Sequence, residues 1–214
     1  MDGNNRWAAK NKKNKFISYS NGASKLLNIT NYIFSSSEAN IVSAFALSNN
    51  NLKRSASLIS TIKKILINFL NKELTDSKID FKILFIGDLS FLSKEIQAKI
   101  KALEKKNINS KKKLIIFLNY SGRFDIYQSV LKIYKKNIRN LNNYLFKDHL
   151  LTNNIPDPDL LIRTGGFQRI SDFMLYQLSF TELVFLKKLW PDISNSDLKK
   201  TIISYRKIDR KFGV

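Results

Sequence analysis

The sequence contains no cysteine and a single histidine, His149, among its 214 residues. Disulfide bonds, cysteine zinc sites and thiol catalysis are therefore excluded. Proline and glycine are scarce, at 3 and 7 residues, and no linker rich in them divides the chain. No apolar run approaches the roughly 20 residues of a membrane-spanning helix, and the polar start lacks a signal-peptide core. We therefore expect a single domain over residues 1–214, cytoplasmic and at most peripheral to the inner membrane face.

Acidic residues are also few, because 17 of them face 37 basic residues and leave a net charge of +20. A field of this sign attracts nucleic acid, anionic lipid surfaces or phosphorylated substrates. Lysine, asparagine and isoleucine make up 78 of the 214 residues, however, and all three have codons rich in A and T. Since codon bias can supply much of the lysine, the eight arginines are more informative than the charge itself.

Short apolar runs alternate with longer segments of helical period. The runs have the length and near-continuous hydrophobicity of strands covered on both faces, and they lie at Ile41–Leu47, Phe81–Ile86, Leu114–Leu118, Asp159–Ile162 and Glu182–Leu186. The helical segments span Ala23–Phe34, Leu58–Leu74, Ser93–Leu103, Asp125–Leu145, Ile170–Phe180 and Ser196–Arg206. This alternation predicts an α/β fold with a mostly parallel sheet flanked by helices.

The segment Leu58–Leu74 repeats large aliphatic residues at i, i+3, i+4 and i+7 over more than four turns. Core packing is the simpler interpretation of this stripe. The wall of an apolar tunnel would need the same residues, so the pattern does not separate the two.

Three polar clusters fall at the ends of apolar runs, where parallel sheets bind ligands. Asp2–Trp7 combines a carboxylate, a glycine and an arginine, which suits Mg²⁺ with a phosphate ligand, or else a solvated terminus. Asn119–Arg123 follows a predicted strand and is either an anion cradle or a plain strand-to-helix turn, which is the commoner case.

The third cluster, Pro156–Ser171, is the densest. A buried strand ends at Arg163, a Gly-Gly turn follows, and Arg169 and Ser171 are predicted to begin a helix. Two guanidinium groups and a hydroxyl at a helix N-terminus predict a diphosphate clamp, because arginine makes bidentate contacts and the helix dipole adds to them.

The order of these motifs resembles that of the cis-prenyltransferases, in particular those of the bacterial undecaprenyl diphosphate synthase (isoprenyl transferase) type. The matching blocks are Met1–Ala8, Asn119–Arg123, Asp157–Gly166, Gln168–Ser171, Glu182–Leu183, Leu189–Asp192 and Arg210–Gly213. They occur in family order across nearly the whole chain, which is far more specific than one short motif.

The resemblance implies a six-stranded, mostly parallel sheet, an apolar tunnel with Leu58–Leu74 as one wall, and a homodimer. It implies a Mg²⁺-dependent enzyme that condenses isopentenyl diphosphate with an allylic diphosphate, usually farnesyl diphosphate. The product would be a long cis-polyprenyl diphosphate such as undecaprenyl diphosphate, the lipid carrier of cell-wall synthesis. Contact with a membrane surface for product release is expected, and specific binding of nucleic acid is not.

Carried over by position, the resemblance assigns catalysis to Asp2 and Asn49 and the metal to Asp2 and Glu182. Substrate binding falls to Gly3, Asn4, Arg6, Trp7, Lys15, Tyr19, Arg163, Arg169 and Ser171. The first three of these match the allylic diphosphate loop, and the last three match the isopentenyl diphosphate site.

The chain also departs from the family. Tyr19 stands in place of a histidine, and Phe167 in place of the glutamate after Gly-Gly. The family block over Phe45–Leu52 keeps only its phenylalanine and Asn49. Its serine, glutamate, tryptophan and arginine are replaced by Ala46, Ser48, Asn50 and Leu52, unless Arg54 supplies the charge. The family's short strand before the Asp2 motif is not among these residues, so the first strand is expected to be missing unless translation starts upstream.

Three interpretations follow: an active, divergent cis-prenyltransferase, a non-catalytic partner subunit of the same fold, and a basic RNA-binding protein. The first is favoured because the diphosphate residues remain while the losses gather in one loop. RNA binding ranks last, since no aromatic and basic nucleic-acid motif accompanies the charge.

Overall fold

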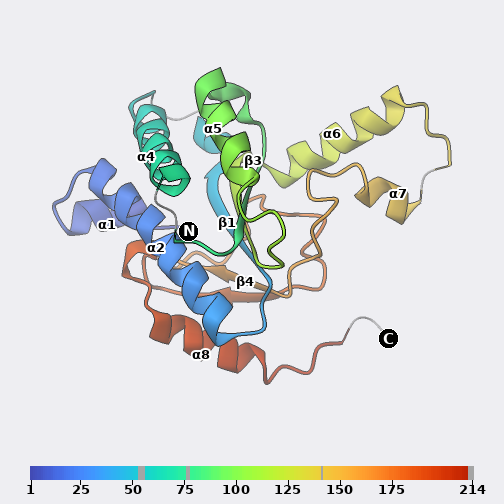
Figure 1. Cartoon of the computed structure of the whole chain (residues 1–214). Helices are drawn as coiled ribbons and strands as arrows, with labels where there is room; N and C mark the ends of the chain where they lie inside the picture. The colour runs from blue at the N-terminus through green and yellow to red at the C-terminus, as the bar shows by residue number, and fades with distance from the viewer. Residues whose placement is uncertain (53–55, 76–77, 141, 212–214) are drawn as a thin grey trace.

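Five strands form two parallel sheets in the computed structural model, which describes residues 1–52, 56–75, 78–140 and 142–211. The larger sheet has the order β1-β3-β2, and the smaller pairs β4 with β5 (Figure 1). The strands are β1 Ile41–Ser48, β2 Lys82–Ile86, β3 Lys113–Tyr120, β4 Leu160–Arg163 and β5 Glu182–Phe185. The five predicted strands and their parallel pairing are confirmed, whereas the count of six is not.

The central strand β3 sets the geometry of the larger sheet. Its residues from Leu114 to Tyr120 are all buried, since helices and loops cover both faces. Ile41 of β1 and Lys82 of β2 both pair with Lys113, so the three strands start together. Their carboxyl ends consequently share one edge, where parallel sheets bind ligands.

Helices surround the two sheets (Figure 1). They are α1 Asn4–Lys10, α2 Lys15–Ser36, α3 Asn49–Leu52, α4 Ala56–Thr75, α5 Lys94–Glu104, α6 Gly122–Lys135, α7 Asn143–Lys147 and α8 Asn195–Tyr205, with 3₁₀ turns η1 Leu89–Phe91 and η2 Trp190–Asp192. Within the described ranges, no helix has both the length and the apolar character needed to cross a bilayer.

Two predicted helices differ from the structure. The segment Asp125–Leu145 is not one helix, because α6 ends at Lys135 and a separate α7 begins at Asn143. Asn137 adopts a left-handed φ of 53°, and the N–H of Ile138 donates to the carbonyl of Ile133, which closes the helix end.

The predicted helix over Ile170–Phe180 is wrong, since this segment consists of turns. Ser171, Asp172 and Met174 have positive φ angles of 52°, 65° and 47°, which no right-handed helix accommodates. Phe173 follows the bend into an aromatic cluster beneath β1 and β3, where it stacks on Phe45 at 4.7 Å between ring centroids. Tertiary packing therefore overrides the local helical period.

Candidate active site

The first residues of the chain and the end of β4 meet in an ion pair. Arg163 NH2 lies 2.9 Å from Asp2 Oδ2, and the arginine side chain is only 13% exposed. Arg6 NH2 approaches Asp2 Oδ1 at 3.5 Å from the first turn of α1. Three of the predicted site residues are thus brought together at the carboxyl end of β4.

Backbone contacts fix Asp2 at this position. Its N–H donates to Thr164 Oγ1 at 2.9 Å, and its carbonyl accepts from the same hydroxyl at 3.0 Å and from the N–H of Trp190 at 2.9 Å. Gly3 turns the chain into α1 with φ 109°, and a Cβ there would lie 2.8 Å from Leu189 Cδ2. Glycine is therefore required for this close approach. Thr164 was not among the predicted site residues, although it directly follows Arg163.

The charge state of Asp2 follows from these neighbours. Burial by itself would raise the pKa of Asp2, but the hydrogen bond and charge of Arg163, the charge of Arg6 and the Gly3 N–H outweigh it. The pKa of Asp2 is therefore lowered, and the carboxylate stays ionised at neutral pH.

Arg163 also ties the predicted clamp residues together. Its NH1 donates to Ser171 Oγ at 2.7 Å and to the carbonyl oxygen of Arg169. Arg163, Arg169 and Ser171 therefore lie together as expected, but the expected helix start at Arg169 and Ser171 is wrong, so no helix dipole contributes. The left-handed conformation of Ser171 turns its hydroxyl toward Arg163 instead.

Asp172 anchors this clamp segment to α6. Its Oδ1 accepts from the N–H of Arg123 at 3.0 Å, its Oδ2 accepts from Ser121 Oγ, and its carbonyl accepts from the N–H of Gly122 at 2.7 Å. The predicted cluster Asn119–Arg123 is therefore a structural junction, because the carboxylate and carbonyl oxygens of Asp172 already accept from its Ser121, Gly122 and Arg123 donors. Its alternative as an anion cradle is not supported. Sequence analysis missed Asp172, and only its place beside Ser171 could have suggested it.

Other predicted residues belong to different parts of the fold. Trp7 Nε1 donates to Asp192 Oδ1 at 2.7 Å, which joins α1 to η2. Lys15 is exposed at the start of α2, and Asn49 begins α3 directly after β1. Glu182 pairs with Leu160, three residues before Arg163, so it sits about 10 Å along the strand pair from the ion pair.

An apolar cavity of about 110 Å³ begins beside this polar site. It lies between α2, α4 and one face of the larger sheet, and its lining is Met1, Asn4, Tyr19, Gly22, Ala23, Leu26, Ala46, Ile62, Ile65, Leu66, Phe69, Phe85, Ile116, Leu118 and Trp190. Asn4 Oδ1 is buried here without a hydrogen-bond partner in the described chain. Four lining residues belong to the Leu58–Leu74 stripe, whose Leu70 is fully buried in the core. The stripe therefore serves both as a cavity wall and as core.

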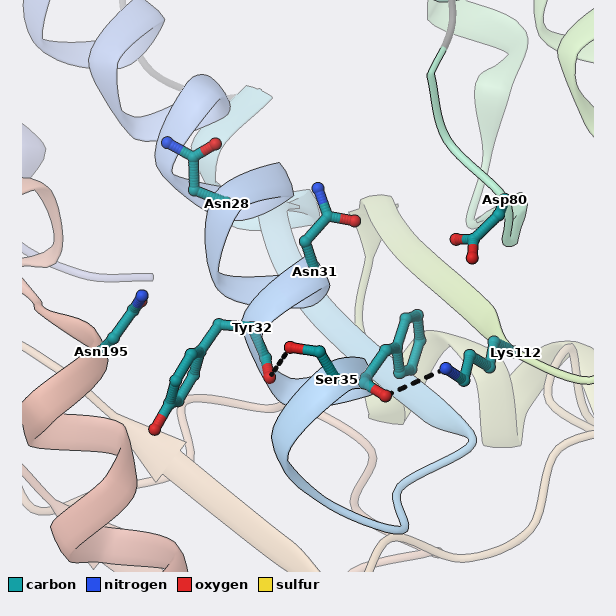
Figure 2. Close-up of a pocket in the computed structure, with 8 residues that line it drawn as sticks. Asn28, Asn31, Tyr32, Ser35, Asp80, Lys112 and Asn195 are labelled. Carbon is teal, nitrogen blue, oxygen red and sulfur yellow. Dashed lines mark hydrogen bonds between the residues drawn. The ribbon is translucent and has the colours of Figure 1, made fainter.

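A second, polar cavity of about 460 Å³ lies toward the other end of α2 (Figure 2). It is lined by Asn28, Asn31, Tyr32, Phe34, Ser35, Asp80, Lys112 and Asn195. Lys112 Nζ already donates to the carbonyl of Phe34 at 2.9 Å. Arg6 and Arg163 instead lie against Asp2, and guanidinium groups of this kind can make bidentate contacts with phosphate oxygens.

These features define an α/β protein with an arginine-rich site at a strand end and an apolar cavity beside it. The family model described as "Putative undecaprenyl diphosphate synthase" matches residues 1–213. The chain therefore belongs to this prenyltransferase family, and the resemblance drawn from the motifs is confirmed.

Individual relatives match over the whole chain. The chain is 35% identical to a ditrans,polycis-undecaprenyl-diphosphate synthase, (2E,6E)-farnesyl-diphosphate specific, of Haemophilus influenzae, over 100% of this chain and 92% of the relative. It is also 35% identical to an isoprenyl transferase of Staphylococcus saprophyticus, over 100% and 87%.

Solved structures show the same fold. Lavandulyl diphosphate synthase from Lavandula x intermedia, in complex with dimethylallyl diphosphate, superposes with a TM-score of 0.88 at 33% identity and covers 100% of this chain and 95% of its own. A probable undecaprenyl diphosphate synthase from Campylobacter jejuni has a TM-score of 0.81 at 27% identity, over 91% and 93%.

Proposed function

We propose that this protein extends an allylic diphosphate, farnesyl diphosphate first, by repeated condensation with isopentenyl diphosphate to a long cis-polyprenyl diphosphate. The observation that carries the proposal is the contact of Asp2 with Arg163 beside an apolar cavity that begins at Met1 and Asn4. The guanidinium group of Arg163 can bind a diphosphate, and the apolar cavity can hold a prenyl tail. The farnesyl-diphosphate specificity of the H. influenzae relative supports the choice of primer.

The proposed reaction moves negative charge onto a departing diphosphate, so the residues that stabilise this charge define the mechanism. The bond between C1 of the allylic substrate and its diphosphate breaks, the alkene of isopentenyl diphosphate forms a bond to C1, and the proton lost from C2 of the isopentenyl unit passes to the released diphosphate. Arg6 stabilises the departing diphosphate, whose negative charge grows in the transition state. Arg163, Arg169 and Ser171 hold the isopentenyl diphosphate, and their mutual contacts orient it beside Asp2. The cavity walls keep the reacting tail away from water.

Mg²⁺ is the cofactor that we assign to this site, with Asp2 as its protein ligand. Within the described residues, no three acidic or histidine side chains converge in a way that could hold a metal. Mg²⁺ is nevertheless often bound by one or two carboxylates together with substrate phosphates, so a single aspartate fits. When bound, the ion would neutralise charge on the leaving diphosphate. Glu182 remains a predicted second ligand or support of the isopentenyl site.

A homodimer is proposed from the exposed face of α6, which projects away from the sheets (Figure 1). Tyr127, Val130 and Tyr134 lie on one helical face and are 57%, 50% and 82% exposed. Large exposed apolar side chains on one helical face are typical of an interface. Val130→Glu with Tyr134→Glu is expected to yield monomers in sedimentation analysis. Lys135→Glu is the control, and a monomeric wild type would contradict the proposal.

Membrane-surface contact is proposed for the corner between α1 and α2. Its exposed cationic and apolar side chains are Lys10, Lys12, Lys13, Lys15, Phe16 and Ile17, and these lysines make no ion pair with a described residue. Cations beside apolar side chains suit anionic lipid headgroups. Wild type should cosediment with phosphatidylglycerol vesicles and not with phosphatidylcholine vesicles. Lys12→Glu with Lys13→Glu should lose this binding, and Lys199→Glu with Lys200→Glu on α8 should keep it.

Product analysis tests the proposed function. Purified protein with Mg²⁺, farnesyl diphosphate and labelled isopentenyl diphosphate should form labelled products longer than the primer. Dimethylallyl diphosphate alone should yield no coupled product. Coupling of dimethylallyl diphosphate without elongation would indicate lavandulyl-type chemistry, and no product at all would favour the non-catalytic partner subunit.

A further inference from the structure

We infer that Phe167 is a positioning residue whose ring gathers the arginines of both diphosphate sites, an inference that rests on the proposed function. The guanidinium carbon of Arg169 lies 4.2 Å from the ring centroid, that of Arg6 lies at 4.8 Å, and that of Arg163 lies at 5.8 Å. Arg6 is assigned to the allylic diphosphate, and the other two are assigned to isopentenyl diphosphate. A single ring therefore joins the two sites.

The Gly-Gly turn before Phe167 determines where the ring stands. Gly165 and Gly166 both have left-handed φ angles, of 88° and 82°. Their N–H groups donate to the carbonyls of Lys188 at 2.7 Å and Leu186 at 2.9 Å, which ties the turn to the segment after β5. A Cβ at Gly165 would lie 2.5 Å from Arg6 NH2, so glycine also lets that arginine reach the ring. Backbone contacts hold the ring in place although Phe167 is 40% exposed.

The charges around the ring explain why such a residue is needed. Three guanidinium groups crowd together, and Asp2 is the carboxylate that pairs with two of them, Arg163 and Arg6. In the described chain, no carboxylate contacts Arg169, and the Phe167 ring is the group that its guanidinium contacts. The negative face of an aromatic ring attracts cations without neutralising them. The site therefore keeps its positive charge for the incoming diphosphates.

Phe167 occupies the position at which the cis-prenyltransferase family has a glutamate. A carboxylate at this position would pair with a guanidinium group and compete with phosphate oxygens for it. The Phe167 ring instead contacts the guanidinium groups through its face, and a diphosphate can bind these groups without displacing the ring. We therefore expect this chain to bind free diphosphate more tightly than a variant that carries the acid.

Titration calorimetry with inorganic pyrophosphate tests the inference without turnover. Phe167→Leu should weaken pyrophosphate binding about fivefold to tenfold, and Phe167→Tyr, which keeps the ring, should stay within about twofold of wild type. Phe167→Glu should weaken binding at least as much as the leucine variant, and it serves as the second variant if the leucine variant does not fold. Phe180→Leu is the matched control, because Phe180 is an exposed phenylalanine, at 58%, whose ring contacts none of the three arginines.

Kinetics separates positioning from general destabilisation. The leucine variant should raise the KM for both substrates several-fold and change kcat less than about twofold, and tyrosine should restore both KM values. Equal pyrophosphate binding by wild type and both non-aromatic variants would overturn the role of Phe167 and leave the proposed function standing. Failure of wild type itself to bind pyrophosphate would overturn both.

Discussion

Asp2 and Arg163 are 161 positions apart in the chain, yet their side chains meet at 2.9 Å. The contact joins the entry to α1 with the end of β4, and Trp190, whose N–H binds the Asp2 carbonyl, adds a third segment. Because each segment is fixed by backbone hydrogen bonds, the charged groups are already in place before a substrate arrives. Such preorganisation reduces the reorganisation that binding and catalysis require.

The lowered pKa of Asp2 predicts a pH dependence of stability. The folded protein keeps this carboxylate ionised to a lower pH than the unfolded chain, whose aspartate has a pKa near 3.8. Asp2 therefore adds stability that is fully present above about pH 5 and is lost as the pH falls through the lowered pKa. Urea unfolding of wild type and Asp2→Asn should show a difference in free energy that shrinks below about pH 4. A difference independent of pH would contradict this account.

Asp172 should affect substrate binding through the segment that it anchors. Asp172→Ala leaves the N–H of Arg123 and the Ser121 hydroxyl without their acceptor, so we expect a loss of about 1 to 2 kcal/mol in the free energy of unfolding. Because Ser171 is the adjacent residue, the KM for isopentenyl diphosphate should rise more than the KM for the allylic substrate. Asp172→Asn should restore part of both effects.

The control for Asp172 is Asp148→Ala, at an exposed aspartate after α7. Steady-state kinetics and thermal unfolding of the three variants provide the measurement. Equal rises in both KM values would show that Asp172 supports the whole site and not the isopentenyl side in particular.

The cavity predicts how product length responds to its walls. Ala23 lines it from α2, so Ala23→Leu should fill part of the space that a growing tail needs and shorten the products. Ser24→Leu places the same side chain one residue along, where it is exposed, and should leave product length unchanged. Chromatography of the dephosphorylated products gives the result. Unchanged chain length in the Ala23 variant would show that the tail lies elsewhere.

The altered block over residues 45–52 predicts a slow enzyme, and the structure refines how to test it. Ala46 lines the cavity and Asn50 is exposed, so Ala46→Ser with Asn50→Trp should raise kcat/KM about tenfold with little change in melting temperature. Leu52 packs against the core, so adding Leu52→Arg should lower the melting temperature. Asn68→Trp, exposed on α4, is the control. Unchanged or reduced activity would mean that other groups have taken over this role.

The predicted strands were correct because buried parallel strands carry a strong local signal, near-continuous hydrophobicity over a strand's length. Residues 170–180 show the opposite case. Their helical period is real, but the burial of Phe173 and the anchoring of Asp172 bend the backbone into left-handed turns. A contact between residues far apart in the sequence, such as that of Phe45 with Phe173, cannot be predicted from local periodicity.

The site could be predicted only in part for the same reason. A resemblance of motifs identified Asp2, Arg163 and Ser171, and the structure brings these three together. Thr164 contacts backbone groups of Asp2, and Asp172 binds mainly backbone N–H groups, which any sequence shares, so residue types did not indicate these two roles. Arg54 and the terminal Phe212–Gly213 lie outside the described residues, and their predicted roles stay predictions.

The incorporation of labelled isopentenyl diphosphate by wild type and Asp2→Asn tests the central claim most directly. Asparagine keeps the size of the side chain and the backbone contacts to Thr164 and Trp190, but it removes the charge that faces Arg163 and the proposed Mg²⁺. The account predicts elongation by wild type, a loss of at least about 100-fold in kcat for the variant, and an unchanged circular dichroism spectrum. Near-normal elongation by the folded variant would contradict the claim that this carboxylate lies at the reaction centre.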